Sequence, residues 1–146
     1  AVDYFRSKNL DIATVYLKPE GNNWIDHSLV ACYNIWLPIS KFIRASGSMC
    51  IIASREIFSK TGGYPEDVVL CEDHDFVYKC SKIGRYGIVP FYLVFSVRRF
   101  DKEGRLVLLF KYLISALYLV TFGPIRKPLF KYEFSKYDDA RVKSKK

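Results

Sequence analysis

Three carboxylates within four positions are the feature of this sequence that most directly indicates chemistry. Glu72, Asp73 and Asp75 follow a loop and open an apolar segment that runs to Ile83. Because like charges repel, a fold keeps them close where a cation, water or a proton transfer uses them. Acidic residues are also favoured in the first turn of a helix, where free N–H groups stabilise them. The spacing alone leaves both interpretations open.

The residues around this acidic cluster predict the elements that position it. The apolar run 49–53 predicts a strand buried on both faces, and Ser54 suits the N-cap of a short helix over 55–60. The pair Gly62-Gly63 predicts a tight turn. The segment 72–83 predicts an amphipathic helix that ends at Gly84, with an apolar face made of Phe76, Val77, Cys80 and Ile83. His74 is expected to point away from this cluster, as a polar surface or loop residue.

Gly47 and Ser48 form a stretch of small residues just before the predicted strand. Small residues let a ligand approach the backbone closely, so both are candidate binding residues. A plain turn into a core strand explains the same residues equally well.

The order of these motifs resembles the second half of family 2 glycosyltransferases. The resemblance covers about residues 1–105, and its motifs are the small pair Gly47-Ser48, Arg55 with Phe58, the Gly-Gly-Tyr turn at 62–64, the E-D-H-D run at 72–75, and Gly84. It implies an α/β fold of the GT-A type, with a mixed sheet and flanking helices. It also implies transfer of a sugar, with inversion, from a nucleotide-diphospho-sugar to the hydroxyl of a glycan or lipid-linked acceptor.

The resemblance assigns roles to individual residues. Asp73 corresponds to the general base that deprotonates the acceptor hydroxyl, and Glu72 and Asp75 are expected to shape its position and field. Gly47 and Ser48 correspond to positions that line the sugar or acceptor pocket.

The first part of such an enzyme is not recognisable in this sequence. The family begins with a nucleotide-binding half that closes with a D-x-D motif, which holds Mg²⁺ or Mn²⁺; no such motif precedes the first predicted strand. We therefore expect the acceptor-side half of the enzyme, as a fragment or as one part of a split arrangement. The N-terminal half would be its partner, and this chain alone would be inactive.

Arg98 and Arg99 follow the predicted strands near residues 86–97. A pair of guanidinium groups suits a diphosphate, because each binds phosphate oxygens bidentately and stays charged. Some family members carry Q-x-x-R-W here, and R-R-F departs from that pattern. A basic collar beside a membrane helix explains the pair equally well.

The net charge of +8 comes entirely from the last third of the chain. Residues 1–97 hold 10 basic and 10 acidic side chains, whereas residues 98–146 hold 13 and 5. The apolar segment 106–123 predicts an interfacial or re-entrant helix, whose polar stripe is Lys111, Ser115, Tyr118 and Thr121. A full membrane span is the second interpretation, a packed soluble helix the third. Residues 124–146 predict a basic tail, of which residues 141–146 are expected to be solvated.

These charges define the classes of function that compete. The enzyme is expected at the cytoplasmic face of a membrane, and the alternative is a non-catalytic module whose basic end binds anionic lipid. No recognised nucleic-acid motif is present, so a nucleic-acid partner is not expected.

The remaining residues predict structure rather than chemistry. We expect a helix over 1–8, a strand over 11–17, a helix from Asp26 or Ser28 to Trp36 that Pro38 breaks, and two short strands separated at Pro90. The four cysteines lack paired spacing and are expected to be reduced; the set Cys71, His74 and Cys80 lacks the spacing of a structural zinc site.

Overall fold

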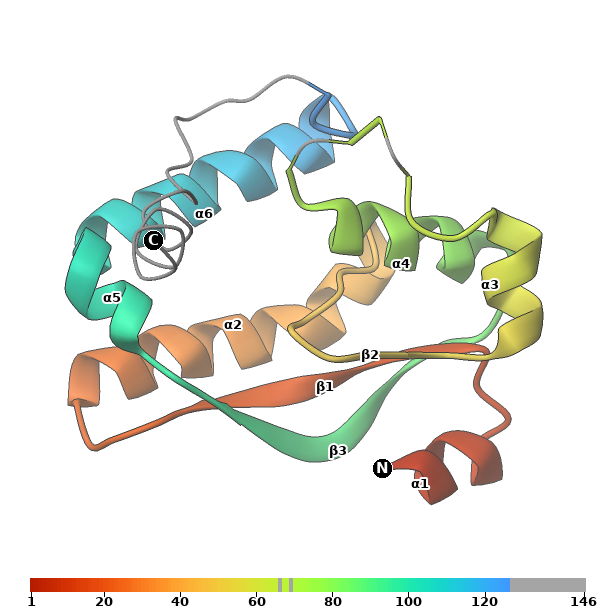
Figure 1. Cartoon of the computed structure of the whole chain (residues 1–146), viewed down its shortest axis with the longest axis horizontal. Coiled ribbons are helices and arrows are strands. Elements are labelled where there is room, and N and C mark those ends of the chain that lie inside the picture. The colour runs from red at the N-terminus through yellow and green to blue at the C-terminus, as the bar shows by residue number, and fades with distance from the viewer. Residues whose placement is uncertain (66, 69, 127–146) are drawn as a thin grey trace, which may run out of the picture.

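A three-stranded mixed sheet lies at the centre of the computed structural model, which describes residues 1–65, 67–68 and 70–126. The central strand β1 (Ile12–Pro19) pairs antiparallel with β2 (Ile51–Ala53) and parallel with β3 (Tyr86–Phe95) (Figure 1). The α/β class and the mixed sheet predicted from the sequence are therefore confirmed.

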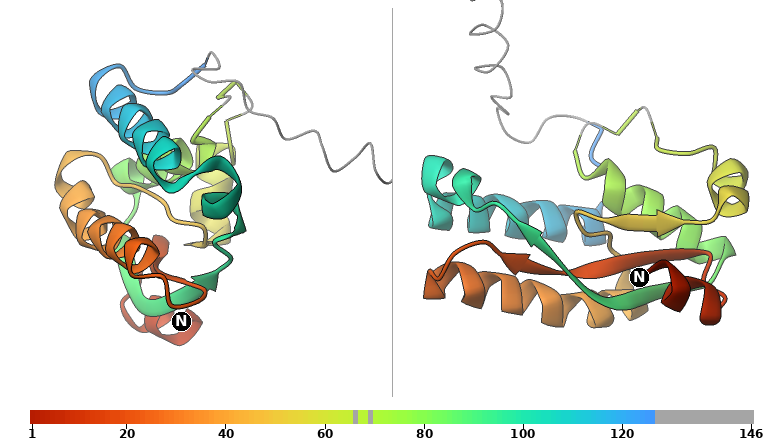
Figure 2. Two further views of the ribbon diagram at one scale, coloured as in Figure 1. Left: turned by 90° about the vertical axis from the view of Figure 1, so that its left-hand side faces the viewer. Right: turned by 60° about the horizontal axis from the view of Figure 1, so that its bottom comes forward.

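Helices flank this sheet along its whole length. They are α1 (Val2–Ser7), α2 (Trp24–Ile43), α3 (Arg55–Thr61), α4 (Glu72–Ile83), α5 (Arg98–Glu103) and α6 (Arg105–Thr121). α2 and α4 pack on β1, and α2 also contacts α6. The views in Figure 2 show α2 and α6 running side by side along the molecule.

Two hydrophobic clusters cover the two faces of the sheet. One joins Ile12 and Tyr86 to the apolar side of α4, where Phe76, Val77 and Cys80 are buried. The other packs Ala13, Val15 and Val89 against Phe5 of α1. Because successive residues of β1 point to opposite faces, consecutive apolar residues supply both clusters. The predicted core face of α4 is confirmed at Phe76, Val77 and Cys80, whereas Ile83 is exposed.

Side chains complete the edge of β1 where β2 ends. β2 pairs only with Ile12 to Thr14. Beyond that point Ser48 Oγ donates to the Val15 carbonyl at 2.8 Å, and the Asn34 amide bonds to both the N–H and the carbonyl of Leu17, at 2.9 and 2.8 Å. These two side chains take the place of a neighbouring strand for the backbone groups of β1.

The prediction that Pro38 breaks a helix is wrong. α2 begins after Asn23, whose side chain accepts a hydrogen bond from the Ile25 N–H at 3.0 Å, and continues through Pro38 to Ile43. A proline inside a helix removes one backbone hydrogen bond, at a cost of about 3 kcal/mol. Burial of Leu37 and Ser40 on either side of the proline offsets that cost.

Two predictions about strands also need correction. The run 49–53 is not a strand buried on both faces: only Ile51–Ala53 pairs, at the edge of the sheet, and these residues are half-buried. Residues 86–95 form one strand rather than two. Its register with β1 jumps from Val89 to Tyr92, so Pro90 and Phe91 form a bulge. A bulge is a position where a residue without an N–H is tolerated inside a strand.

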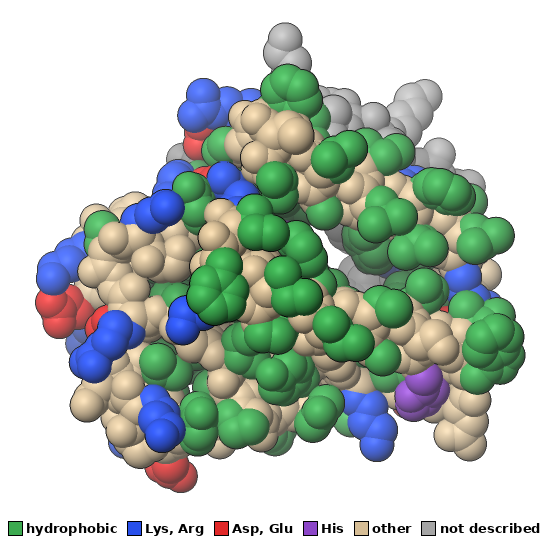
Figure 3. All heavy atoms as spheres, turned by 180° about the vertical axis from the view of Figure 1, so that it is seen from behind, with side chains coloured by type: hydrophobic (Ala, Val, Ile, Leu, Met, Phe, Trp, Pro, Cys, Tyr) green, Lys and Arg blue, Asp and Glu red, His purple; other side chains and the backbone are tan. Residues whose placement is uncertain are grey.

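Part of the predicted polar stripe of α6 faces the protein, whereas Thr121 at its end is exposed. Ser115 is buried, and Lys111 Nζ lies 2.8 Å from Glu103 Oε2. The opposite side of α6 is apolar and exposed, and Figure 3 shows hydrophobic side chains gathered over α2 and α6 on that face of the molecule. No helix among the described residues is both long and apolar enough to cross a membrane.

The segment after α6 returns to the body of the protein. The helix ends before Gly123-Pro124, as predicted. Ile125, within the segment predicted as a basic tail, is fully buried and forms an isolated antiparallel bridge with Leu70. The rest of that tail, residues 127–146, lies outside the described residues.

Candidate functional site

The acidic cluster forms the first turn of α4, as the sequence predicts. The residue before it, Cys71, is the N-cap and has a left-handed backbone (φ 59°, ψ 37°), which side chains other than glycine rarely adopt. No side chain caps this helix end. A backbone conformation of this kind costs free energy and persists only where the surrounding fold enforces it. Such residues cluster at functional sites.

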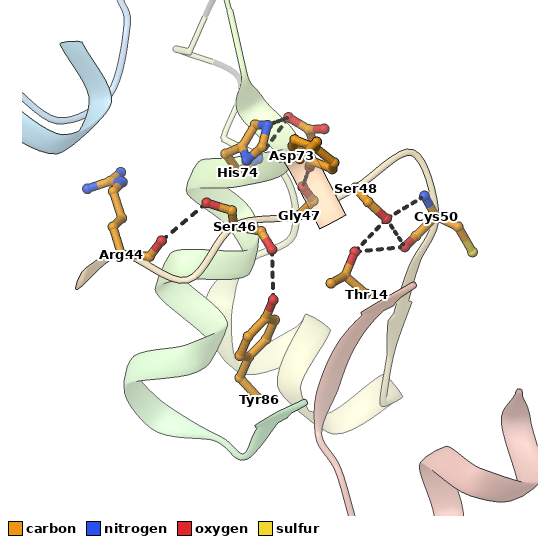
Figure 4. A network of polar contacts seen from close by, with 10 residues as sticks. Thr14, Arg44, Ser46, Gly47, Ser48, Cys50, Asp73, His74 and Tyr86 are labelled. Carbon is orange, nitrogen blue, oxygen red and sulfur yellow. Dashed lines mark hydrogen bonds and ion pairs between the residues drawn. The ribbon is translucent and has the colours of Figure 1, made fainter. Parts of the chain in front are cut away.

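Asp73 is a partly accessible carboxylate that this turn orders. Its Oδ1 accepts a hydrogen bond from the His74 backbone N–H at 2.8 Å, and the same oxygen lies 4.0 Å from His74 Nε2 (Figure 4). The side chain is 37% exposed, and both of these contacts use the same oxygen, Oδ1. The expectation that His74 points away from the cluster is wrong.

Gly47 lies directly against the backbone of the acidic turn. A Cβ added there would come within 3.3 Å of the Asp73 carbonyl, 3.0 Å of Ile51 Cδ1 and 3.2 Å of Val77 Cγ2. The Gly47 carbonyl accepts a hydrogen bond from the Tyr33 hydroxyl at 2.6 Å. Gly47 therefore permits close packing of the loop against α4, which holds the Asp73 backbone in place.

Burial and the negative charge of Asp73 raise the pKa values of neighbouring side chains. Burial, followed by the negative charge of Asp73, raises the pKa of the Tyr33 hydroxyl above its ordinary value. Burial and the charges of Asp73 and Glu72 raise the pKa of the Cys71 thiol to about 12, and they also raise the pKa of the Tyr64 hydroxyl. Two protonated phenols and a protonated thiol thus adjoin the carboxylate at neutral pH.

Asp75 has a different environment from Asp73. It is buried, with its Oδ1 2.8 Å from Arg44 Nη2. Lys79 Nζ lies 3.1 Å from Oδ2, close enough for an ion pair although not aligned as a hydrogen bond. The Arg44 guanidinium also stacks over the Tyr78 ring, 4.0 Å from its centroid. Asp75 thus anchors α4 to the end of α2, while Glu72 is exposed beside Asp73.

Ser48 faces the sheet rather than an open surface. Its hydroxyl is buried and accepts a hydrogen bond from Thr14 Oγ1 at 2.6 Å (Figure 4). The same hydroxyl donates to the Val15 carbonyl, so its hydrogen bonds stabilise β1. Of the two small residues, Gly47 adjoins Asp73 and Ser48 serves the fold.

The structure does not bring Arg98 and Arg99 to the acidic turn. Both open α5, close to the start of α6, where Arg99 Nε binds Glu103 Oε1 at 2.8 Å. The acidic turn lies at the other end of α6, because Leu70 bridges Ile125. The 17 residues of α6 span about 25 Å.

The described residues hold no group of three metal-ligating side chains close enough to bind an ion. Asp75 forms ion pairs with Arg44 and Lys79, and one oxygen of Asp73 accepts a hydrogen bond from the His74 N–H. The acidic turn therefore does not fit a metal site. The four cysteines, Cys32, Cys50, Cys71 and Cys80, are free thiols.

A cavity of about 480 Å³ lies at the other end of α4, away from Asp73. Its lining includes three cationic side chains, Lys41, Lys82 and Arg85. Nothing in the local sequence predicts this cavity, because these residues come from α2, from α4 and from the residue just before β3. The contacts of Tyr33 with Gly47 and of Arg44 with Asp75 were also missed, since each joins segments far apart in the chain.

No protein-family model matches this chain, and no curated protein or solved structure matches it significantly.

Proposed function

We propose that this chain is the acceptor-side part of an inverting glycosyltransferase of the family 2 type, with Asp73 as the general base. The observation that carries the proposal is the geometry of the acidic turn: one carboxylate is held by a backbone N–H and left partly open, while its neighbour Asp75 is buried in ion pairs. Environments that differ this much divide two carboxylates between a reactive and a structural role.

In the proposed reaction, Asp73 accepts the proton of an acceptor hydroxyl while that oxygen attacks the anomeric carbon. The bond from this carbon to the nucleotide diphosphate breaks, and the diphosphate leaves with the electron pair. A general base in this position contributes about 10²- to 10⁴-fold to the rate. The donor nucleotide-sugar and a divalent metal held by a D-x-D motif would belong to the predicted nucleotide-binding half, whereas the acceptor would bind beside Asp73.

The residues around Asp73 have supporting roles in this proposal. Gly47 permits the close approach that fixes the Asp73 backbone, and Asp75 positions the first turn of α4 through Arg44. Glu72 adds negative charge at the mouth of the site. Binding of the leaving diphosphate by Arg98 and Arg99 stays a prediction, and the described residues do not supply its geometry.

The test is Asp73→Asn in the protein expressed from its whole reading frame. Release of nucleotide diphosphate is measured with a panel of nucleotide-sugars and with glycan and lipid-linked acceptors. We expect turnover to fall about 10²- to 10⁴-fold, with an unchanged melting temperature because the side chain is partly exposed. Asp3→Asn, at an exposed position in α1, is the matched control.

Two results would count against the proposal. If Asp73→Asn and Asp3→Asn both turn over like the wild type, Asp73 is not the base. If the wild-type protein consumes no nucleotide-sugar but binds anionic vesicles, the non-catalytic membrane module is the better description.

A further inference from the structure

α2 and α6 together expose a large apolar surface on one face of the molecule (Figure 3). We call this surface the α2–α6 face. Its members are Ile35, Ile39, Phe42 and Ile43 from α2, and Leu106, Val107, Phe110, Leu113, Ile114, Leu117 and Val120 from α6. Phe42, at 86% exposure, protrudes furthest among them. Figure 3 also shows a hollow between the side chains over the two helices. Exposed apolar side chains gathered in this way mark a site of association in soluble domains.

The orientation of α6 is what creates this surface. Two of its polar residues are used inside the protein, where Lys111 pairs with Glu103 and Ser115 is buried. A bidentate ion pair joins Arg105 to the buried Asp26 at 2.7 and 3.0 Å, so the first turn of α6 is fixed against the first turn of α2. The two apolar sides therefore face outward together, opposite to the arrangement expected of a helix exposed to water.

The cationic cavity adjoins the α2–α6 face. Phe42 and Ile43 belong to both, and Lys41, Lys82 and Arg85 line the same cavity. Lys82 Nζ lies 4.8 Å from the centroid of the Tyr78 ring, which forms part of the wall. Two carboxylates lie nearby: Asp11 Oδ2 accepts the backbone N–H of Arg85, and Arg44 and Lys79 pair with Asp75. Neither neutralises the three cations of the lining.

We propose that the α2–α6 face docks on an anionic lipid bilayer and that the cavity binds the phosphate of a lipid headgroup. Apolar side chains would enter the boundary between headgroups and acyl chains, as those of interfacial helices do. Lys41, Lys82 and Arg85 would lie at the level of the headgroups, where cations bind anionic lipid phosphates. Charge complementarity selects the lipid: a purely apolar protein partner would leave these cations unpaired at its edge.

Full-length chain is mixed with vesicles of phosphatidylcholine alone or of phosphatidylcholine with phosphatidate, and binding is measured by co-sedimentation. We expect binding to require phosphatidate and to weaken as salt rises. The triple substitution Lys41→Gln, Lys82→Gln, Arg85→Gln should weaken binding about a hundredfold, because each cation near an anionic surface strengthens it about fivefold. Phe42→Ser should weaken it about tenfold by removing inserted apolar area.

A matched triple separates the cavity from net charge. Arg6→Gln, Arg55→Gln, Lys60→Gln removes the same charge at exposed positions on α1 and α3, and should keep nearly full binding. Circular dichroism checks that every variant stays folded. Equal losses in the two triples, or strong binding to phosphatidylcholine alone, would overturn the headgroup site.

Inorganic phosphate distinguishes the source of the anion. If millimolar phosphate shifts the NMR signals of the cavity residues while vesicles bind the cavity triple normally, the cavity binds a free phosphate and the headgroup site is refuted. None of these measurements depends on sugar transfer. A negative result would refute lipid docking without bearing on Asp73 as the general base, and loss of the Asp73 proposal would leave lipid docking standing.

Discussion

Replacing Ser48 by alanine distinguishes a role in the fold from a role in substrate binding. The Ser48 hydroxyl is buried and joins three groups of β1: it donates to the Val15 carbonyl at 2.8 Å, and it accepts from Thr14 Oγ1 at 2.6 Å and from the Val15 N–H at 3.4 Å. Alanine leaves the Val15 carbonyl without this donor and removes the shortest contact of Thr14.

The expected loss follows from the groups that are left without partners. A buried polar group that loses its hydrogen bond costs about 1–3 kcal/mol. The Thr14 hydroxyl keeps a longer contact with the Cys50 carbonyl at 3.3 Å, which limits the penalty. We therefore expect Ser48→Ala to lower the free energy of unfolding by about 2–3 kcal/mol.

A double-mutant cycle with Thr14→Val makes this reasoning sharper. Valine has nearly the shape of threonine but no hydroxyl, so the double variant leaves fewer polar groups unpaired than the two single variants do separately. We expect it to be more stable than additivity predicts, by about 1 kcal/mol. Urea titrations followed by far-UV circular dichroism give the free energies of unfolding of the wild type and the three variants.

Two outcomes would refute this account of Ser48. A loss below about 0.5 kcal/mol for Ser48→Ala would fall within the range of surface substitutions and would show that the hydroxyl does not support β1. Strict additivity in the cycle would show that Thr14 and Ser48 act independently, despite the 2.6 Å contact.

Three further predictions concern Asn34, Gly84 and Cys71. Asn34→Ala removes both side-chain hydrogen bonds to Leu17 and should cost about 2 kcal/mol in urea titrations, whereas the exposed Asn22→Ala should be neutral. Gly84→Ala would place a methyl group 2.6 Å from Ile57 Cδ1 and should cost about 1–3 kcal/mol; unchanged stability would mean that α3 moves aside freely. The pKa of the Cys71 thiol is raised in the folded protein from near 9 to about 12, so its stabilising contribution is complete below pH 9 and is lost as the pH rises toward 12. The urea midpoint should therefore fall over this range, and less steeply in Cys71→Ser.

Features that depend on neighbouring residues were predictable from the sequence. The N-cap of α3 at Ser54 and the bounds of α4 follow from local chemistry, and the structure has both. Predictions failed where distant residues decide the outcome. α2 continues through Pro38 because flanking residues are buried against other elements, and no local pattern shows that β2 lies at an edge of the sheet.

The candidate site divides in the same way. The acidic cluster is visible in the sequence, but the different environments of Asp73 and Asp75 depend on Arg44, which lies 31 positions before Asp75. The ion pair that holds Lys111 of α6 against the protein depends on Glu103, which precedes the helix. Spacing alone places charged residues on a helix face and leaves their partners undetermined.

The two proposed activities share a physical connection. The segment that leads into the acidic turn is tied to the end of α6 by the bridge between Leu70 and Ile125. Cys71, one residue later, already has a left-handed backbone, so the turn has little freedom to adjust. A bilayer that holds α6 would therefore restrain the position of Asp73. If docking acts in this way, amide hydrogen exchange of residues 70–75 should slow on binding to phosphatidate vesicles; unchanged exchange there, with protection of α6, would show that the lipid-binding face and the acidic turn act independently.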